Sequence, residues 1–142
     1  MGKKRNEVLI GLADQALQSS HLFKDKDKTE IPDGYNGQIA ALSVSVAMIG
    51  IRPTLAIYYQ DKPKKNKSDK KDISTPYRLA VLEVVAKMMT LDHFCNRENW
   101  TSRGMLEYAL SESSDLKELK KEVIDCAIAL KQVVRTYKLV KV

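Results

Sequence analysis

Residues 115–138 read DLKELKKEVIDCAIALKQVVRTYK, and this stretch decides the fold class of the chain. Its apolar residues recur at alternating steps of three and four, which is the spacing of one face of an α-helix. These residues are Leu116, Leu119, Val123, Cys126, Leu130, Val133 and Tyr137. Asp115 is a good N-terminal cap, and Glu118 follows three residues later, as in a capping box. The stretch therefore predicts one long helix with a narrow packing face.

The segments that precede this stretch also show helical spacing. The helices expected from it cover residues 103–112, about 76–94, 53–60, 38–50 and 7–20. From Leu42 to Val46 the sequence alternates as in a strand, but an apolar run of about thirteen residues is long for a strand of about five or six. Gly50 suits the end of a helix there. With no clear strand, the sequence predicts an all-α fold, a single-domain bundle of five to six helices over residues 1–142.

The charge of the chain is unevenly distributed. Of the 142 residues, 44% are hydrophobic and 30% are charged, which is typical of a soluble globular domain. The net charge is +6. Residues 62–72 hold six lysines and two aspartates, and Lys3, Lys4 and Arg5 lie together near the start. The irregular sequence at about 62–74 predicts a flexible basic loop.

The apolar segments are too short to cross a membrane. The longest apolar run, residues 39–51, is interrupted by Ser43, Ser45 and Gly50, whereas a spanning helix needs about 20 consecutive apolar residues. The start of the chain also lacks the apolar core and the cleavage site of a secretory signal. We therefore expect a cytoplasmic protein that does not enter the membrane.

The sequence shows no recognisable catalytic or metal-binding pattern. Cys95 and Cys126 lie far apart and belong to no set of four zinc ligands, so we expect both to be buried, reduced thiols. His21 and His93 each lie at the end of a predicted helix, where a cation complements the helix dipole. No glycine-rich phosphate loop is present. We therefore expect no catalytic activity, no cofactor, no metal and no small-molecule substrate.

The cations are the best functional candidates. Lys131, Arg135 and Lys138 follow one another at i, i+4 and i+7, so on a helix their side chains share one face that can follow phosphate groups. Cations in the last turns of a helix also complement its dipole, and this alternative stays open. Arg52 is a further candidate, although it can equally cap helix carbonyls. Candidates in the basic loop are Lys64, Lys65 and Lys67.

The aromatic residues do not alternate with these cations, as a platform for stacking single-stranded bases would require. Tyr58 and Tyr59 end a buried helix, and we expect them to pack in the core. Trp100 lies in a polar turn, which makes it a candidate contact with another protein, because tryptophan is enriched at such contacts.

Two segments resemble a known family, the small subunit of type III-B CRISPR effector complexes, called Cmr complexes. Residues 35–59, YNGQIAALSVSVAMIGIRPTLAIYY, resemble the hallmark of that family. In the family a tyrosine leads a buried helix, a glycine plus an apolar residue ends it, and a helix similar to TLAFY follows. The resemblance, with the last helix included, covers about a third of the chain.

Residues 115–138 resemble the last helix of the family, which often carries an aromatic residue followed by Leu, Lys and Arg. Leu130 and Lys131 match this pattern. Ala129 stands in place of the aromatic residue, and Gln132 in place of the arginine. The second departure removes one cation from the basic surface of the family, for which Arg135 could compensate.

The resemblance implies a small all-helical protein without catalytic activity that serves antiviral defence. Several copies of such a subunit stack beside the backbone subunits that hold the CRISPR RNA, and they present basic surface to guide and target RNA. The expected partners are therefore CRISPR RNA and target RNA, other Cmr complex subunits and further copies of the same chain. Recognition of an RNA duplex through its backbone requires lysines and arginines at helical spacing.

Two other functions remain open. A helical DNA-binding regulator would need a recognition helix with base-reading side chains on an exposed face. The pair of helices closest to a helix-turn-helix, residues 38–61, is too apolar to lie in a DNA groove. A small enzyme of unrecognised chemistry is the second alternative, because acid and base groups can assemble from distant parts of a chain.

Overall fold

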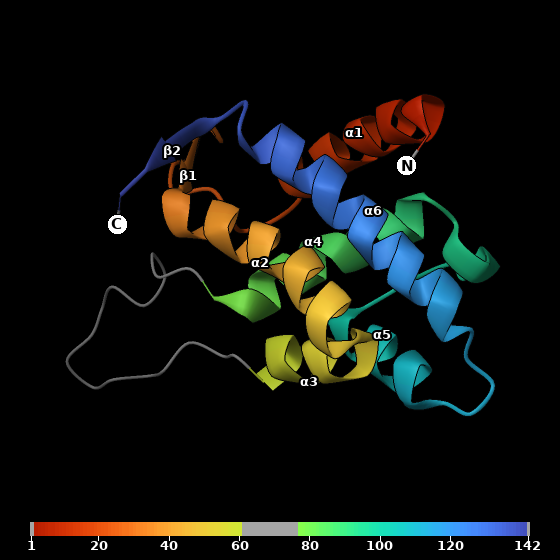
Figure 1. The fold of residues 1–142 in the computed structure, drawn as a ribbon. Helices are drawn as coiled ribbons and strands as arrows, with labels where there is room; N and C mark the ends of the chain where they lie inside the picture. Colours follow the sequence, from red (N-terminus) through yellow and green to blue (C-terminus); the bar gives the residue numbers. More distant parts are fainter. Residues whose placement is uncertain (1, 61–76, 142) are drawn as a thin grey trace.

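The computed structural model describes residues 2–60 and 77–141. Over these residues the chain forms six α-helices, one short 3-10 helix and two short strands. The helices are α1 (Lys3–Gln18), α2 (Asp33–Ile49), α3 (Ile51–Gln60), α4 (Arg78–Leu91), α5 (Ser102–Leu110) and α6 (Leu116–Val134). The 3-10 helix η2 spans Phe94–Asn96, and the strands are β1 (Glu30–Pro32) and β2 (Lys138–Val140). The chain is a mostly helical single domain (Figure 1), as its sequence predicts.

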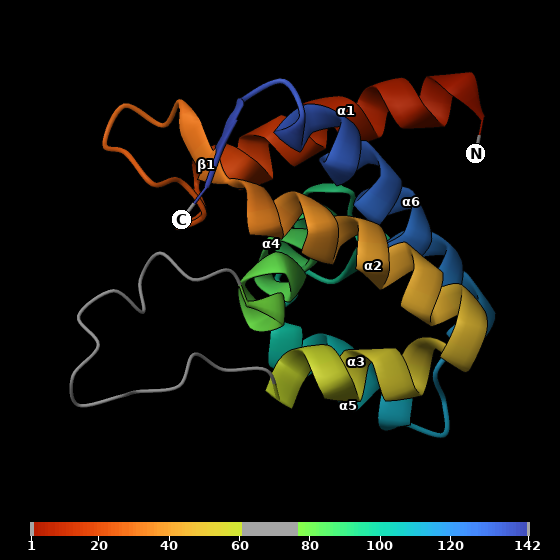
Figure 2. The same cartoon turned by 60° about the vertical axis from the view of Figure 1, so that its left-hand side comes forward.

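The long helix α6 lies between α1 and α2 and packs against both (Figures 1 and 2). α2 and α6 run side by side in opposite directions. α3 and α5 pack together at one end of the molecule, and the two strands lie at the other end. This arrangement places the start of α6 near α5 and its end near β2.

The helix α4 forms the centre of the core. Between Val81 and Met89 only Glu83 and Lys87 are exposed. Such a helix, apolar around most of its circumference, is stable only when neighbours cover it, and α1, α2, α3, α5 and α6 all pack against it. Burial of its large apolar side chains contributes about 1.5–3 kcal/mol each to folding.

The structure confirms the expected start of α6. The carboxylate of Asp115 accepts a hydrogen bond from the backbone N–H of Glu118 at 3.1 Å, which satisfies one of the unpaired donors of the first turn. The predicted packing face is buried from Leu119 to Val133. The helix ends at Val134, four residues before the predicted end, because the chain then turns into β2.

α2 and α3 form a helical hairpin with a turn that requires glycine. Gly50 joins them with φ 96° and ψ 166°, a backbone conformation that is essentially restricted to glycine. The hydroxyls of Ser45 and Thr54 hydrogen-bond at 2.8 Å across the pair, and the hydroxyl of Tyr58 donates to the carbonyl of Gln38 at 2.8 Å. The core position predicted for Tyr58 is thus confirmed, while Tyr59 is half-buried.

The strands β1 and β2 form a small parallel sheet that was not predicted from the sequence. Each strand has only three residues, and Glu30 lies opposite Lys138 in the register. A pair this short has no sequence signal of its own, because the alternation that marks a strand needs about four residues or more. α2 also begins earlier than predicted, at Asp33, directly after β1.

Candidate nucleic-acid interface

One line of side chains on α6 lies on the side of the helix opposite its most buried face, where Ile124 and Lys131 are half-buried and the others are exposed. We call it the outer row of α6, and it consists of Lys117, Lys121, Ile124, Ile128, Lys131 and Arg135. Its members follow one another at steps of four and three, so they share one side of the helix. From first to last the row covers about 27 Å at 1.5 Å per residue. Two cations lie at each end, two isoleucines lie in the middle, and the row contains no carboxylate.

The structure keeps two of the three cations predicted to share a face. Lys131 lies in the last turn of α6, and Arg135 is the residue that caps the helix, still with helical backbone angles. Lys138 does not belong to this face, because it lies in β2, where its ammonium group is 3.8 Å from the carboxylate of Glu30. The prediction that all three share one helical face is therefore wrong. The sequence could not indicate where the helix would end.

Arg52 is far from these cations. It lies in the first turn of α3 at the opposite end of the molecule from β2. Its Nε donates a hydrogen bond to the carbonyl of Ala109, near the end of α5, at 2.6 Å. Arg52 was considered either as a phosphate contact or as a cap of helix carbonyls, and the structure shows the second arrangement. This hydrogen bond joins α3 to α5.

The candidates in the basic loop cannot be placed. The residues Lys64, Lys65 and Lys67 lie outside the described residues, as does the flexible segment predicted at 62–74.

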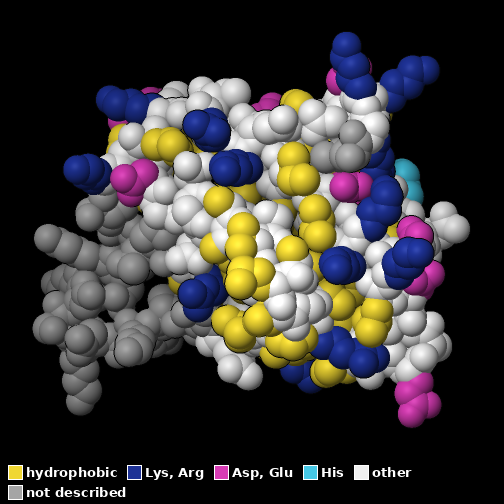
Figure 3. Space-filling model, in the orientation of Figure 1, with side chains coloured by type: hydrophobic (Ala, Val, Ile, Leu, Met, Phe, Trp, Pro, Cys, Tyr) yellow, Lys and Arg dark blue, Asp and Glu magenta, His cyan; other side chains and the backbone are white. Residues whose placement is uncertain are grey.

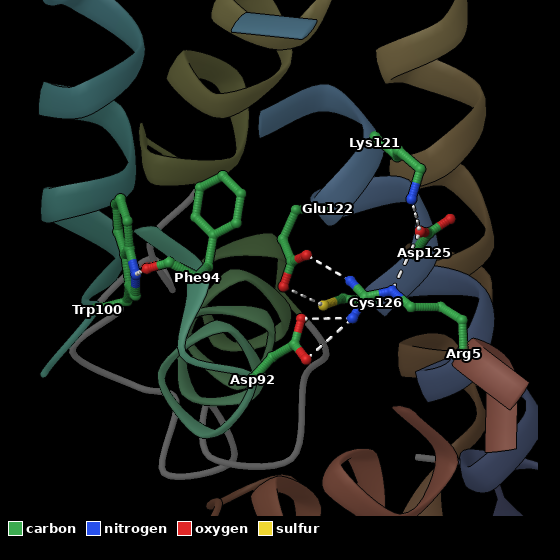
Figure 4. A network of polar contacts seen from close by, with 8 residues as sticks. All are labelled: Arg5, Asp92, Phe94, Trp100, Lys121, Glu122, Asp125 and Cys126. Carbon is green, nitrogen blue, oxygen red and sulfur yellow. Dashed lines mark hydrogen bonds and ion pairs between the residues drawn. The ribbon is translucent and has the colours of Figure 1, made fainter. Parts of the chain in front are cut away.

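A second group of charged residues joins α1 to α4 and α6 (Figure 4). We call it the Arg5 network. From the first turns of α1, the guanidinium of Arg5 lies 2.8 Å from a carboxylate oxygen of Asp92 and 2.6 Å from one of Glu122. Asp125 lies 3.7 Å from Arg5 Nε and 3.2 Å from the ammonium group of Lys121. Two cations therefore face three carboxyl groups, and the network is neutral only when one carboxyl group holds a proton.

Glu122 is the carboxyl group of the network whose pKa is raised. Burial raises its pKa to about 8, and the hydrogen bond and charge of Asp92 act in the same direction, against the lowering effect of Arg5. Burial also raises the pKa of the Cys126 thiol, which lies 3.7 Å from Glu122. A buried acid with a raised pKa is a candidate catalytic group. Here the raised pKa of Glu122 has a structural explanation, because Glu122 is buried among the charged groups that join α1, α4 and α6.

Trp100 has a different place from the one predicted. Its side chain is 3% exposed and packs against Phe94 and Tyr108, with ring centroids 5.5 Å apart in both pairs. Its indole N–H donates to the carbonyl of Phe94 at 3.0 Å (Figure 4), and the guanidinium of Arg97 lies 4.0 Å from its ring centre. The predicted role of Trp100 as an exposed contact is therefore wrong, because the 3-10 turn at η2 folds the polar loop over it.

The two cysteines also differ from each other. Cys126 is buried, as predicted, whereas Cys95 is exposed in η2 with φ 53°. The prediction of a buried thiol is therefore wrong for Cys95, which lies on the exposed turn η2. His21 and His93 are exposed next to the helix ends, where the sequence places them.

Lys117 and Lys121 were not predicted from the sequence as members of a basic surface. The signal was available, because both lie opposite the buried face in the same repeat that predicts the helix. They were hidden by Glu118, Glu122 and Asp125, which make the segment nearly neutral in sequence. On the helix two of these carboxylates turn inward to the Arg5 network.

Searches for similar proteins found no matching family model, no matching curated protein and no matching solved structure. The class that the fold defines is a mostly helical single domain, with six helices and a two-stranded parallel sheet in the part of the chain that the structure describes. Within residues 2–60 and 77–141, no helix is long and apolar enough to cross a membrane. The same residues contain no group of three or more His, Cys, Asp or Glu side chains placed to hold a metal ion.

Proposed function

We propose that this protein is the non-catalytic small subunit of a type III-B CRISPR ribonucleoprotein, a Cmr complex. In this role it holds guide and target RNA through contacts with the RNA backbone. It stacks in several copies beside the other subunits of a cytoplasmic antiviral complex. It needs no cofactor, because cleavage belongs to the backbone subunits in the family it resembles.

The observation that carries the proposal is the basic end of the outer row of α6. Lys131 and Arg135 lie one turn apart on the same side of the helix, and neither belongs to the Arg5 network. Cations at helical spacing can contact successive phosphates without reading bases, which is what a subunit that holds RNA of any sequence requires. Lys138, across the turn in β2, can add to this attraction, although Glu30 offsets part of its charge.

The helical hairpin of residues 35–59 supports the resemblance. Tyr35 is buried in the first turn of α2, and burial raises its pKa to about 12. Gly50 ends that helix and Ile51 starts α3 in the core. The hallmark residues of the family thus occupy positions that need an aromatic ring, a glycine and an apolar side chain for packing reasons.

The test is RNA binding by the assembled complex. The variant Lys131→Ala with Arg135→Ala should weaken binding of target RNA, and the dependence of binding on salt concentration should become shallower by about one to two released counterions. Each lost phosphate contact should cost about 1 kcal/mol, so the double variant is preferred to single variants. The matched control is Lys26→Ala with Lys87→Ala, which removes two exposed lysines from other elements. An unchanged salt dependence in the double variant would contradict the assignment of Lys131 and Arg135 as contacts to RNA phosphates.

Two further measurements separate the alternatives. A gel shift that compares double-stranded DNA with guide RNA tests the helical DNA-binding regulator, which should prefer the DNA. A nuclease assay on the isolated protein tests the small enzyme, and metal-dependent cleavage would favour it over our proposal. Purification from the native host asks whether a small CRISPR RNA and several partner proteins accompany the chain.

A further inference from the structure

The loop between α4 and α5 places an arginine over two aromatic rings. The guanidinium carbon of Arg97 lies 4.0 Å from the ring centre of Trp100 and 5.7 Å from that of Tyr108. A distance of 4.0 Å is van der Waals contact, so the guanidinium group rests on the face of the indole ring. Arg97 is exposed, whereas Trp100 beneath it is buried. We call this arrangement the Arg97 platform and define it by Arg97, Trp100 and Tyr108.

The ring beneath Arg97 has a fixed position. The backbone N–H of Trp100 donates to the hydroxyl of Thr90 at 2.8 Å, and its indole N–H donates to the carbonyl of Phe94 at 3.0 Å. The ring of Phe94 also packs against the indole (Figure 4), and the ring of Tyr108 meets it edge-on at an interplanar angle of 90°. A ligand that contacts the platform therefore meets a rigid surface, so the protein loses little conformational entropy on binding.

The same loop has a strained backbone and polar side chains at its surface. His93, Cys95 and Asn96 have φ values of 56°, 53° and 56°, in the left-handed region that residues other than glycine rarely adopt. Residues held in this region cluster at functional sites. Asn96 and Asn99 are exposed on either side of Arg97 in the chain, and their amides can hydrogen-bond the edge of a planar ligand. The loop therefore offers planar hydrogen-bonding groups beside a planar cation.

We propose that the Arg97 platform binds an unpaired nucleobase, which stacks on the exposed face of the Arg97 guanidinium while the opposite face stays on Trp100. Proteins stack unpaired bases on aromatic rings and on arginine planes, and this platform combines the two. An arginine suits the position better than a lysine, because the guanidinium is planar and rests on rings. The proposal rests on the proposed function only for the source of the base, which is then an unpaired stretch of guide or target RNA.

The surroundings of Arg97 favour a base over a phosphate or an acidic peptide. Glu98 is exposed next to Arg97 in the chain, and its carboxylate reduces the attraction of the loop for anions. A second arginine, Arg103, makes a looser contact, since it lies 5.7 Å from the ring centre of Tyr59 and 3.8 Å from the carboxylate of Glu107. Stacking on the closely held Arg97 is therefore the contact that the loop supports best.

The apolar surface over α2 and α6 does not provide such a plane. In Figure 3 hydrophobic side chains gather there, with Lys and Arg side chains at the borders. Val44 and Met48 on α2 are 55% and 78% exposed, and both side chains are aliphatic. Neither has a flat face on which a base can stack, so we expect the base at the Arg97 platform and not at this surface.

Binding of a short unstructured RNA strand, such as oligouridylate, to the isolated full chain tests the inference. Trp100 is the only tryptophan of the chain, so its fluorescence reports on the platform directly. We expect its emission to change in a saturable way as the strand binds. A strand of the same length without bases keeps the phosphates, and it should bind at least about tenfold more weakly because it cannot stack.

Two substitutions separate stacking from charge. Arg97→Ala should weaken binding of the intact strand by about tenfold. Arg97→Lys keeps the charge but not the plane, so it should weaken binding as well. Lys26→Ala, which removes an exposed lysine before β1, is the control for the loss of one positive charge. Circular dichroism and the melting temperature show whether each variant is folded. If Arg97→Ala does not fold, the comparison of the two strands on the native chain still decides.

Three results would overturn the inference: equal binding of the intact strand and the strand without bases, native affinity in Arg97→Lys, or a constant Trp100 emission at saturation. An acidic peptide that bound as tightly as the strand, with the same change in emission, would also overturn it. The proposed function is tested separately. Lys131→Ala with Arg135→Ala should change the salt dependence of RNA binding, but not the ratio of the affinities for the two strands.

Discussion

The Arg5 network and the outer row of α6 lie on two sides of the same helix, and both contain cations. In the network Arg5 contacts three carboxyl groups, of which Glu122 and Asp125 are each 5% exposed. In the outer row Lys117, Lys131 and Arg135 have no carboxylate beside them in the row. The first set of charges connects helices, and the second faces outward from the fold.

This difference shows that folding separates cations that pair with carboxyl groups from cations that stay exposed to solvent. Arg5 belongs to a basic cluster in sequence, but in the fold its half-buried guanidinium faces the carboxyl groups of Asp92 and Glu122. Burial lowers the pKa of Arg5, but the hydrogen bond to Asp92 and the negative charge of the neighbouring carboxyl groups raise it, so the pKa is raised overall. Lys3 and Lys4, its neighbours, remain exposed. Only the exposed cations can attract a polyanion.

The largest effect is expected for Arg5→Ala. The change leaves Asp92, Glu122 and Asp125 together without their shared cation, and breaking a buried ion pair costs about 3 kcal/mol or more. The free energy of unfolding, measured with urea, should fall by this amount. The free energy of unfolding of Arg5→Lys should lie between those of Arg5→Ala and the native protein, because one ammonium group cannot reach all three carboxyl groups. Lys4→Ala is the control, and an equal loss there would show that the network is not special.

The next effect concerns the pH dependence of stability. The pKa of Glu122 is about 8 in the folded protein and ordinarily 4.5, so between these values the folded state holds a proton that the unfolded state has lost. Glu122 therefore lowers stability progressively as pH rises from about 4.5 to 8. Glu122→Gln mimics the protonated form, so unfolding at pH 9 should require a few kcal/mol more than in the native protein.

At pH 4 the same variant should differ little from the native protein, since Glu122 is then protonated in both states. Glu107→Gln is the matched control, because Glu107 is exposed and lies 3.8 Å from Arg103, on the same helix. A Glu122→Gln variant that lost stability equally at pH 4 and pH 9 would contradict the assigned protonation.

A smaller effect is expected for Lys121→Ala. Lys121 belongs to both regions, since it lies in the outer row and contacts Asp125 at 3.2 Å. Its side chain is 62% exposed, so water screens the pair and the loss should be about 0.5 kcal/mol. Thermal unfolding would measure it. A loss of stability as large as that of Arg5→Ala would show that Lys121 contributes to the Arg5 network as strongly as Arg5 does.

The smallest effect on stability is expected for Lys131→Ala with Arg135→Ala. Both residues lie at the surface away from the Arg5 network, and such changes usually alter stability by less than about 0.5 kcal/mol. Unfolding in urea should therefore match the native protein, while RNA binding by the complex should weaken. A large loss in the free energy of unfolding of this variant would contradict the view that the Arg5 network stabilises the fold and that Lys131 and Arg135 do not.

The helical architecture followed from local patterns. The repeat in residues 115–138 predicted α6 and its buried face, and Asp115 caps that helix as expected. The apolar run before Gly50 predicted α2, which the structure confirms. These predictions worked because helical periodicity and capping depend on residues a few positions apart.

The candidate site was only partly predictable. Lys131 and Arg135 lie on one side of the helix, as their spacing indicates. Lys138 does not, because pairing with Glu30 draws the chain into a strand. Trp100 is buried because a turn of η2 and Arg97 cover it. Contacts over such distances leave no local mark in the sequence.

The sequence by itself determined the fold class, the buried faces of the long helices and the amount of charge. Only the tertiary structure decided which charges remain free of the fold. Arg5 and Glu122 are 117 residues apart, and their contact exists because α1 and α6 pack side by side. An ion pair forms wherever the backbone brings two side chains within reach, and burial then decides its strength and its protonation. Periodicity in the sequence fixes the side of a helix on which a residue lies, but the neighbour it meets there is fixed only by packing.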